Sequence, residues 1–281
     1  MGVKGVIVAA GYGSRFLPVT RVVPKELLPI VDRPAIDFVV QEFADAGIED
    51  VLVITSRRKK ALDDWFDRDV ELERAVDPAR LGYPRVRAQF VRQTEMKGTG
   101  HALLLARAFA GSDPFVVAFP DDLFAENCSK LLIDEYHLTG RSVLATGDLS
   151  GEDVSRYGVV AVRDAGDRLA VTDIVEKPPK GTEPSSIVSW GRYLYTPELF
   201  PALDEGLRGH LDRSVGAHPG EYYATDAIRE LARRDRVVAK VIPGARYDTG
   251  DRLGYLTTVL EHALAHPELG EPLRAWIRSR V

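Results

Sequence analysis

The chain has 281 residues, of which 45% are apolar and 28% are charged, which is typical of a globular protein. The balance of 37 Lys and Arg residues against 42 Asp and Glu residues gives a net charge of −5, which argues against a nucleic-acid binder and against a protein that binds anionic membranes. Cys128 is the only cysteine, so an internal disulfide and a CxxC-type zinc site are excluded.

The N-terminal apolar run is too short for a signal peptide and leads directly into a Gly-rich turn. No segment approaches the ~18 consecutive apolar residues that are needed to span a bilayer. We therefore expect a cytoplasmic protein.

The first half of the chain alternates between strand and helix patterns. Strands are expected at Val3–Ala10, Val51–Thr55, Val86–Gln93 and Phe115–Pro120, and helices at Pro34–Ala46, Lys59–Phe66 and Thr99–Ala110. This order predicts a parallel sheet with helices on both faces. Ligands of such a sheet bind beyond the carboxyl ends of the strands.

The pattern changes after about residue 140. Short polar connections separate the strands expected at Ser142–Gly147, Val159–Arg163, Leu169–Val175 and Ile187–Tyr195, which indicates an antiparallel or mixed region. Helices follow near 221–234, 251–265 and 267–280, with a strand at Val237–Ile242 after the first of them. We expect one compact body over 1–281.

A Gly-rich turn follows the first strand. Gly11 and Gly13 allow backbone N–H groups to approach phosphates closely, and Arg15 and Lys25 add two cations to the same loop. A triphosphate needs backbone donors around it and cations that neutralise it. The glycine spacing matches neither the dinucleotide fingerprint GxGxxG nor the P-loop, because Phe16 stands where each requires a glycine.

Two adjacent carboxylates, Asp121 and Asp122, follow the apolar strand expected at Phe115–Pro120. Like charges side by side should raise the pKa of at least one carboxyl group unless a cation separates them. Mg²⁺ is suited to one or two carboxylates together with phosphate oxygens. Because successive strand residues point in opposite directions, we expect only one of the two to meet a metal.

Two further motifs have less specific residue patterns. Gln93 precedes Gly98-Thr99-Gly100, where a flat base can lie against the backbone, although a ligand-free helix N-cap explains the residue types equally well. Glu176 and Lys177 end a strand before two prolines; such a pair can bind sugar hydroxyls and a phosphate but is more often a solvated turn.

The motifs together closely resemble the bacterial UTP–glucose-1-phosphate uridylyltransferases of the sugar nucleotidyltransferase family. The resemblance begins at AAGYGSRFLPVT and PKELLPIVDRP and continues, in order, through QTEMKGTGHALLLA, FPDDL, SRYGVV, VEKP, GRYLYTPELF, GEYYATDAI, RYDTGD and HPELGE. It implies an α/β fold, the three-layer α/β/α Rossmann-like nucleotidyltransferase fold with a mixed central sheet. It also implies UTP and sugar 1-phosphate as substrates, Mg²⁺ as cofactor and a homo-oligomer, a dimer or tetramer.

The resemblance also divides the single domain into parts. It implies a nucleotide-binding part over about 1–140, a sugar-binding part over about 141–250 and C-terminal helices over 251–281. Catalytic roles fall on Arg15, Lys25 and Lys177, and metal binding on Asp121 and Asp248. The substrate-binding positions are Ala10, Gly11, Gly13, Glu26, Gln93, Gly98, Asp122, Gly158 and Glu176, with Gln93 and Gly98 at the pyrimidine. His101 receives no catalytic role.

Two departures from the family pattern concern substrate choice and assembly. Residues 67–86 stand where the family usually has a longer helical insertion. The segment GEYYATDA stands where the family usually has GEIQLTDA, and its Tyr222 and Tyr223 make this segment more similar to that of the acetylglucosamine-phosphate uridylyltransferases. The alternatives are dTTP in place of UTP, another hexose 1-phosphate, or a silent regulator that binds nucleotide sugar. PKELLP and the AAG start favour UTP, and the full set of charged site residues favours an enzyme.

Overall fold

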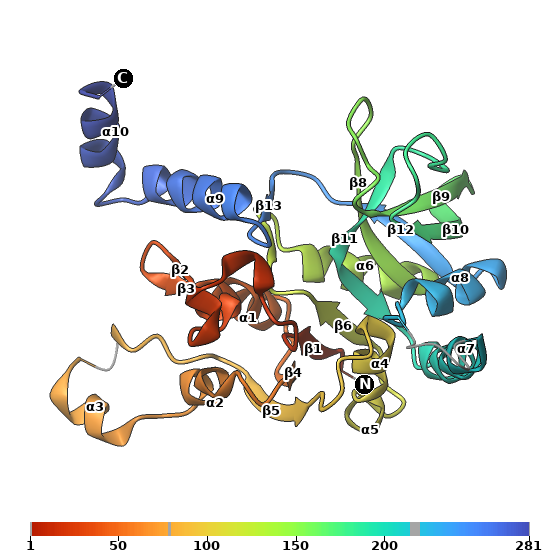
Figure 1. Ribbon diagram of the computed structural model, residues 1–281, viewed down its shortest axis with the longest axis horizontal. Coiled ribbons are helices and arrows are strands. Elements are labelled where there is room, and N and C mark those ends of the chain that lie inside the picture. Colours follow the sequence, from red (N-terminus) through yellow and green to blue (C-terminus); the bar gives the residue numbers. More distant parts are fainter. Residues whose placement is uncertain (1, 78–79, 214–219, 281) are drawn as a thin grey trace.

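A nine-stranded mixed sheet forms the centre of the molecule, in the order β5-β4-β1-β6-β11-β8-β12-β10-β9 (Figure 1). The computed structural model describes residues 2–77, 80–213 and 220–280. The strands are β1 (Lys4–Val8), β4 (Asp50–Thr55), β5 (Arg87–Arg92), β6 (Phe115–Ala118), β8 (Ser142–Asp148), β9 (Gly158–Asp164), β10 (Leu169–Glu176), β11 (Ile187–Tyr195) and β12 (Val237–Val241).

The strand directions confirm the change of pattern near residue 140. Strands β5, β4, β1 and β6 run parallel to one another, whereas β11 is antiparallel to both β6 and β8, and β10 is antiparallel to β9 and β12. One parallel pair remains in the second half, between β8 and β12. The sheet is therefore mixed, as expected.

Alternating strand residues bury two separate apolar cores, one on each face of the sheet. In β1, for example, Val6 belongs to one core and Ile7 to the other, because successive side chains point to opposite faces. The first face is covered by α1 (Ala35–Asp45), α2 (Lys60–Phe66) and α6 (Cys128–Thr139). The second is covered by α4 (Thr99–Leu104), α5 (Arg107–Ala110), α7 (Leu199–Arg213) and α8 (Thr225–Arg233). These are the three layers of an α/β/α fold.

Two helix predictions need correction. The helix expected over Thr99–Ala110 is two helices, because the N–H groups of Leu105 and Ala106 bond three residues back and tighten the chain between them. The helix expected near 221–234 begins only at Thr225, because the backbone of Tyr222 is hydrogen-bonded to the start of α4.

Several elements were not expected. They are the short hairpin β2 (Pro29–Ile30) and β3 (Arg33–Pro34), α3 (Val70–Ala75), α6, α7, and the two-stranded ladder of β7 (Asp122–Phe124) with β13 (Arg246–Asp248). Helix α7 holds a proline and two glycines, which hide its apolar spacing. Short 3₁₀ turns η1 (Ser14–Phe16), η2 (Val19–Arg21) and η3 (Lys25–Leu27) occupy the loop after β1.

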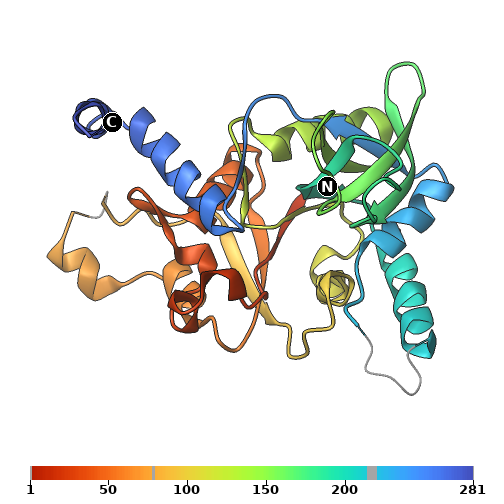
Figure 2. The same ribbon diagram turned by 45° about the horizontal axis from the view of Figure 1, so that its top comes forward.

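The chain ends in two helices that extend away from the sheet. Helix α9 (Arg252–Ala265) crosses above the loop that follows β1, and α10 (Gly270–Arg278) projects beyond it (Figure 2). The Arg252 side chain donates to the carbonyl oxygens of Arg15 and Leu17, at 2.9 and 3.2 Å, and the Tyr255 hydroxyl donates to that of Pro29 at 2.6 Å. Helix α9 therefore supports the Gly-rich loop. None of the helices among the described residues is long and apolar enough to cross a bilayer.

Candidate active site

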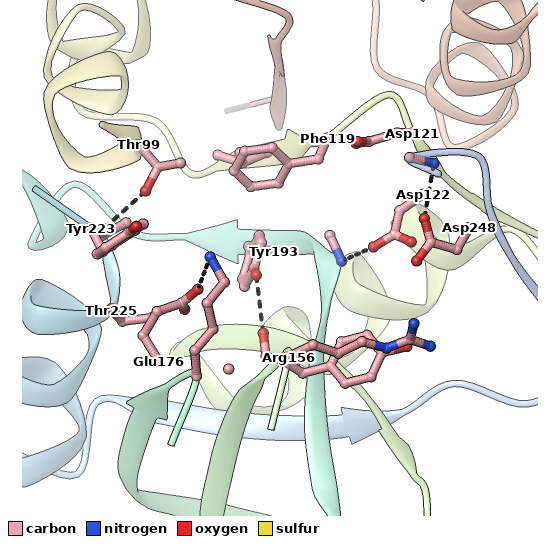
Figure 3. A pocket seen from close by; sticks show the side chains of 18 of the residues that line it. Thr99, Phe119, Asp121, Asp122, Arg156, Glu176, Tyr193, Tyr223, Thr225 and Asp248 are labelled. Carbon is pink, nitrogen blue, oxygen red and sulfur yellow. Dashed lines mark hydrogen bonds and ion pairs between the residues drawn. The ribbon is translucent and has the colours of Figure 1, made fainter. Parts of the chain in front are cut away.

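A cavity of about 530 Å³ opens where strands of the two halves of the sheet end (Figure 3). The predicted site residues that line it are Gly13, Arg15, Lys25, Asp121, Asp122, Gly158, Glu176, Lys177 and Asp248. These residues come from positions as far apart as 13 and 248, and the fold brings them to one place.

The Gly-rich loop is held in a fixed shape by its own contacts. Gly13 adopts the left-handed conformation, with φ at 66°, and its carbonyl oxygen accepts a 2.8 Å hydrogen bond from the Thr20 hydroxyl. A Cβ at Gly13 would be strained by this φ and would lie 3.2 Å from the Thr20 methyl group. The loop thus turns the chain so that Arg15 and Lys25 both face the cavity.

Lys25 and Asp121 form an ion pair, with 2.5 Å between Nζ and Oδ2. Burial alone would lower the pKa of Lys25, but the Asp121 and Glu26 carboxylates outweigh it, so the pKa is raised. Burial alone would raise the pKa of Asp121, but Lys25 outweighs it and the pKa is lowered. Both groups are therefore charged at neutral pH, and the cation of the loop is already positioned by the carboxylate.

Asp121, Asp248 and Arg15 converge on Gly250. The Asp121 Oδ2 and Asp248 Oδ1 atoms each lie 3.0 Å from the point that a Cβ on Gly250 would occupy. Arg15 Nη1 donates to the Gly250 carbonyl oxygen at 3.1 Å, and the Gly250 N–H donates to Asp248 Oδ1 at 2.9 Å. A side chain at position 250 would crowd both carboxylates, so glycine lets them lie close together at the cavity wall.

Asp122 is committed to protein partners. Its Oδ2 accepts a 2.5 Å hydrogen bond from the Gly191 N–H, and its Oδ1 is ion-paired with Arg246, which also lies 3.5 Å from Asp248. Burial, together with the charges of Asp121 and Asp248, raises the pKa of Asp122 against the opposing effect of Arg246. One of the two adjacent carboxyl groups, that of Asp122, thus has a raised pKa as expected, although burial contributes more to the rise than the neighbouring carboxylates do. Sequence reasoning missed Arg246, although the RYDTGD motif contains it.

The opposite wall of the cavity is formed by residues of β9, β10 and the turn that follows β10. Gly158 and Glu176 are paired in the β9–β10 ladder, and a Cβ at Gly158 would lie 3.3 Å from Glu176 Oε2. Lys177 follows with a φ of 46°, which is rare for a residue with a side chain, and its Nζ lies 3.6 Å from Glu176 Oε1. The left-handed backbone turns this lysine toward the cavity at the end of its strand.

The residues expected at the base lie beside the cavity. Among the described residues, Ala10, Gly11, Glu26, Gln93 and Gly98 are outside its lining. The buried Gln93 side chain donates to the Gly98 carbonyl oxygen at 3.1 Å and lies 3.1 Å from His101 Nδ1. Gln93 is thus linked to the turn that begins α4.

Glu26 has a partner that the sequence did not indicate. Both of its carboxylate oxygens accept hydrogen bonds from the buried Lys59 ammonium, at 2.7 and 2.8 Å. The Glu26 side chain is only 1% exposed. In this structure Glu26 therefore stabilises the loop beside Lys25. A substrate group that binds Glu26 would have to donate to a carboxylate that already accepts two hydrogen bonds from Lys59.

The two tyrosines of the GEYY segment differ in position. Tyr222 is 1% exposed and packs against glycines: a Cβ would approach its ring within 2.4 Å at Gly100 and its hydroxyl within 2.3 Å at Gly206. Tyr223 lines the cavity, and its ring centroid lies 5.3 Å from Lys177 Nζ. Of the two tyrosines, only Tyr223 can therefore contact a molecule in the cavity directly.

Comparison with known proteins agrees with this geometry. Residues 4–260 match the family model described as nucleotidyl transferase. The UTP–glucose-1-phosphate uridylyltransferase of Bacillus subtilis (strain 168) is 41% identical over 282 residues, which cover 96% of this chain and 94% of the relative. The enzyme of the same name from Streptococcus pneumoniae serotype 4 is 40% identical, with coverage of 98% and 94%.

Solved structures give the same result. A UDP-glucose pyrophosphorylase complexed with UDP-glucose superposes with a TM-score of 0.84 at 36% identity, over 95% of this chain and 100% of that one. A UTP-bound UGPase from Acinetobacter baumannii superposes with a TM-score of 0.85 at 33% identity, over 99% of each chain.

Proposed function

The chain belongs to the nucleotidyl transferase family, and from this premise we propose that it transfers a uridylyl group from UTP to glucose 1-phosphate, giving UDP-glucose and pyrophosphate. The observation that supports this reaction most strongly is the convergence of Arg15, Lys25, Asp121 and Asp248 on one wall of a cavity whose other wall holds Glu176 and Lys177. One wall is suited to a triphosphate and the other to a sugar phosphate.

The reaction is an in-line displacement at phosphorus. An oxygen of the sugar phosphate, already ionised at neutral pH, attacks the α-phosphorus of UTP while the bond to the β-phosphate oxygen breaks and pyrophosphate leaves. No protein nucleophile is required. The residues accelerate the reaction by positioning the two substrates and by neutralising charge.

Each of the three cations binds a different phosphate group. Arg15 holds the leaving pyrophosphate and Lys25 the nucleotide phosphates, because both extend from the Gly-rich loop into the cavity. Lys177 on the opposite wall holds the sugar phosphate, and the Glu176 carboxylate accepts hydrogen bonds from sugar hydroxyls beside Gly158.

The carboxylates fit a magnesium ion. One oxygen each of Asp121 and Asp248 lies beside Gly250, where the first is paired with Lys25 and the second accepts from the Gly250 N–H. Both carboxylates line the cavity, so a bound Mg²⁺ would share them with these partners, whereas both oxygens of Asp122 are held by Gly191 and Arg246. Within residues 2–77, 80–213 and 220–280 there is no group of three or more His, Cys, Asp or Glu side chains that could hold a metal, so phosphates and waters would complete the coordination, which is typical of Mg²⁺. When bound, Mg²⁺ neutralises the charge that develops on the phosphates.

We propose that the base lies against the turn from Gln93 to Gly98, and that Ala10, Gly11 and Glu26 also belong to the nucleotide site. Gly98 has a φ of 97°, and a Cβ there would lie 2.4 Å from the Tyr222 carbonyl oxygen. Any side chain at this position would therefore disrupt the turn.

The test is pyrophosphate release from the purified protein over a panel of UTP, dTTP, CTP and ATP with several hexose 1-phosphates. We expect UTP with glucose 1-phosphate to give the highest kcat/KM. Turnover that is faster with dTTP would change the nucleotide assignment. Binding of UDP-glucose without pyrophosphate release from any triphosphate would show that the protein is a regulator and not an enzyme.

The same premise supports assembly into a dimer or tetramer and a cytoplasmic location. Leu253, Leu256 and Leu260 lie exposed on α9 at the spacing of one helix face, which favours burial against another subunit. Light scattering at several concentrations measures the subunit number. The division into a nucleotide part, a sugar part and C-terminal helices stays a proposal that limited proteolysis can test.

A further inference from the structure

Lys177 has few protein contacts that fix its ammonium group. Its side chain is 54% exposed, and the 3.6 Å to Glu176 Oε1 is long for a hydrogen bond. The backbone is fixed, because the Lys177 N–H donates to the Tyr157 carbonyl oxygen at 2.9 Å and the φ is 46°. The flexible four-carbon chain beyond it needs a second support if the charge is to meet a phosphate at a defined point.

Tyr223 is placed to give that support. Its ring centroid lies 5.3 Å from Lys177 Nζ, within the range of a cation–π interaction, and the ring lines the same cavity (Figure 3). The negative face of an aromatic ring attracts an ammonium group and leaves its N–H groups free to donate to a phosphate.

The segment that holds Tyr223 is fastened to the nucleotide half. The Tyr222 N–H donates to the Lys97 carbonyl oxygen at 2.8 Å, the Gly100 N–H donates to the Tyr222 carbonyl oxygen at 3.0 Å, and the Ala224 N–H donates to the Thr99 hydroxyl at 3.1 Å. These bonds lie on both sides of Tyr223, so the ring is attached to the Gly98–Gly100 turn on which the base is proposed to lie.

We infer that Tyr223 is a positioning residue that holds the Lys177 ammonium for the sugar phosphate and sets its place relative to the bound nucleotide. Tyr222, buried against Gly100 and Gly206, is the anchor of this arrangement and does not meet the sugar. The inference rests on the proposed function, because it assigns Lys177 to the sugar phosphate.

The experiment compares Tyr223→Leu with Tyr223→Phe, with KM for glucose 1-phosphate and for UTP measured separately. Tyr223→Leu removes the aromatic face and should raise KM for glucose 1-phosphate about 3- to 30-fold, the range that cation–π energies imply, with KM for UTP nearly unchanged. Tyr223→Phe keeps the face and should retain most of the affinity for the sugar phosphate. Tyr83→Leu, far from the cavity, is the control for loss of a tyrosine.

A double-mutant cycle with Lys177→Met separates positioning from direct contact. If Tyr223 acts through the lysine, Tyr223→Leu should have little further effect on kcat/KM in the Lys177→Met background. Equal losses in both backgrounds, or a Tyr223→Leu enzyme with normal KM for glucose 1-phosphate, would overturn the inference. Failure of the proposed function is distinguishable, because the unmodified protein itself would then release no pyrophosphate from UTP.

Discussion

The two walls of the cavity hold their cations in different ways. On the nucleotide wall, Lys25 is 19% exposed and lies 2.5 Å from a carboxylate oxygen, and Arg15 is hydrogen-bonded to a carbonyl oxygen at 3.1 Å. On the sugar wall, Lys177 is 54% exposed and lies 3.6 Å from its nearest carboxylate oxygen. Preorganised charges need no rearrangement during reaction, whereas a loosely held lysine loses side-chain freedom when it binds. We therefore expect changes on the nucleotide wall to lower kcat and changes on the sugar wall to raise KM.

The largest effect is expected for Asp121→Asn, which removes the proposed anionic metal ligand and leaves the partly buried Lys25 ammonium without its charged partner. Turnover at saturating Mg²⁺ should fall about 10³-fold or more, since metal neutralisation contributes several kcal/mol in the transition state. The affinity for UDP-glucose, measured by calorimetry, should fall less than turnover does.

Asp248→Asn is the matched variant, because Asp248 has Arg246 nearby but no lysine that depends on it. Wild-type turnover in Asp121→Asn would place the metal ligand elsewhere, with Asp122 the first alternative. Sequence reasoning alone suggests that Asp121→Asn relieves repulsion and stabilises the metal-free protein. The ion pair with Lys25 reverses that expectation, so a lower melting temperature is predicted.

Arg15→Ala and Lys25→Ala should each lower kcat about 10²–10³-fold, the range found when a preorganised group that stabilises developing charge is removed. Because Arg15 also bonds to Gly250, circular dichroism must show that both variants keep their fold. Near-normal kcat in both folded variants would contradict the proposed contrast between the walls.

Lys177→Met tests the other side of the comparison. Hydrogen bonds to a charged group imply a rise of roughly 10- to 100-fold in KM for glucose 1-phosphate, with KM for UTP almost unchanged. Initial-rate kinetics in both substrates separate the two constants. An equal rise in both would show that the walls do not act independently.

The smallest effect concerns sugar choice. Glucose 1-phosphate should be preferred over N-acetylglucosamine 1-phosphate by at least about tenfold in kcat/KM, because the Glu176 carboxylate can accept hydrogen bonds from adjacent ring hydroxyls. Comparable values would contradict this preference. They would direct attention to Tyr223, since Tyr222 is buried.

The sequence predicted the long strands of both halves of the fold better than the short elements and the glycine-rich helix. The apolar runs at β1, β4 and β6 are buried on both faces, and such runs can be recognised without knowledge of their partners. Helix α7 was missed because its glycines and proline resemble loop residues. Strands β7 and β13 were missed because three-residue strands leave almost no periodic signal.

The candidate site followed a similar rule. Motifs with unusual residue types, such as the Gly-rich loop and the paired aspartates, indicated where charge would gather. The partners of those charges could not be predicted: Lys59 for Glu26 and Arg246 for Asp122 come from distant segments. Ion pairs between distant residues depend on the tertiary fold, and a single sequence does not reveal them.

The short ladder between β7 and β13 has a consequence for how the protein is made. It places Asp248 opposite Asp122, and the following Gly250 receives Arg15, so the phosphate wall is built from both ends of the chain. During synthesis, a ribosome-bound chain can already contain the Gly-rich loop and Asp121 while residue 250 is still inside the exit tunnel. Until Asp248 and Gly250 have emerged, the hydrogen bonds that join Arg15 to Gly250 and Gly250 to Asp248 cannot form.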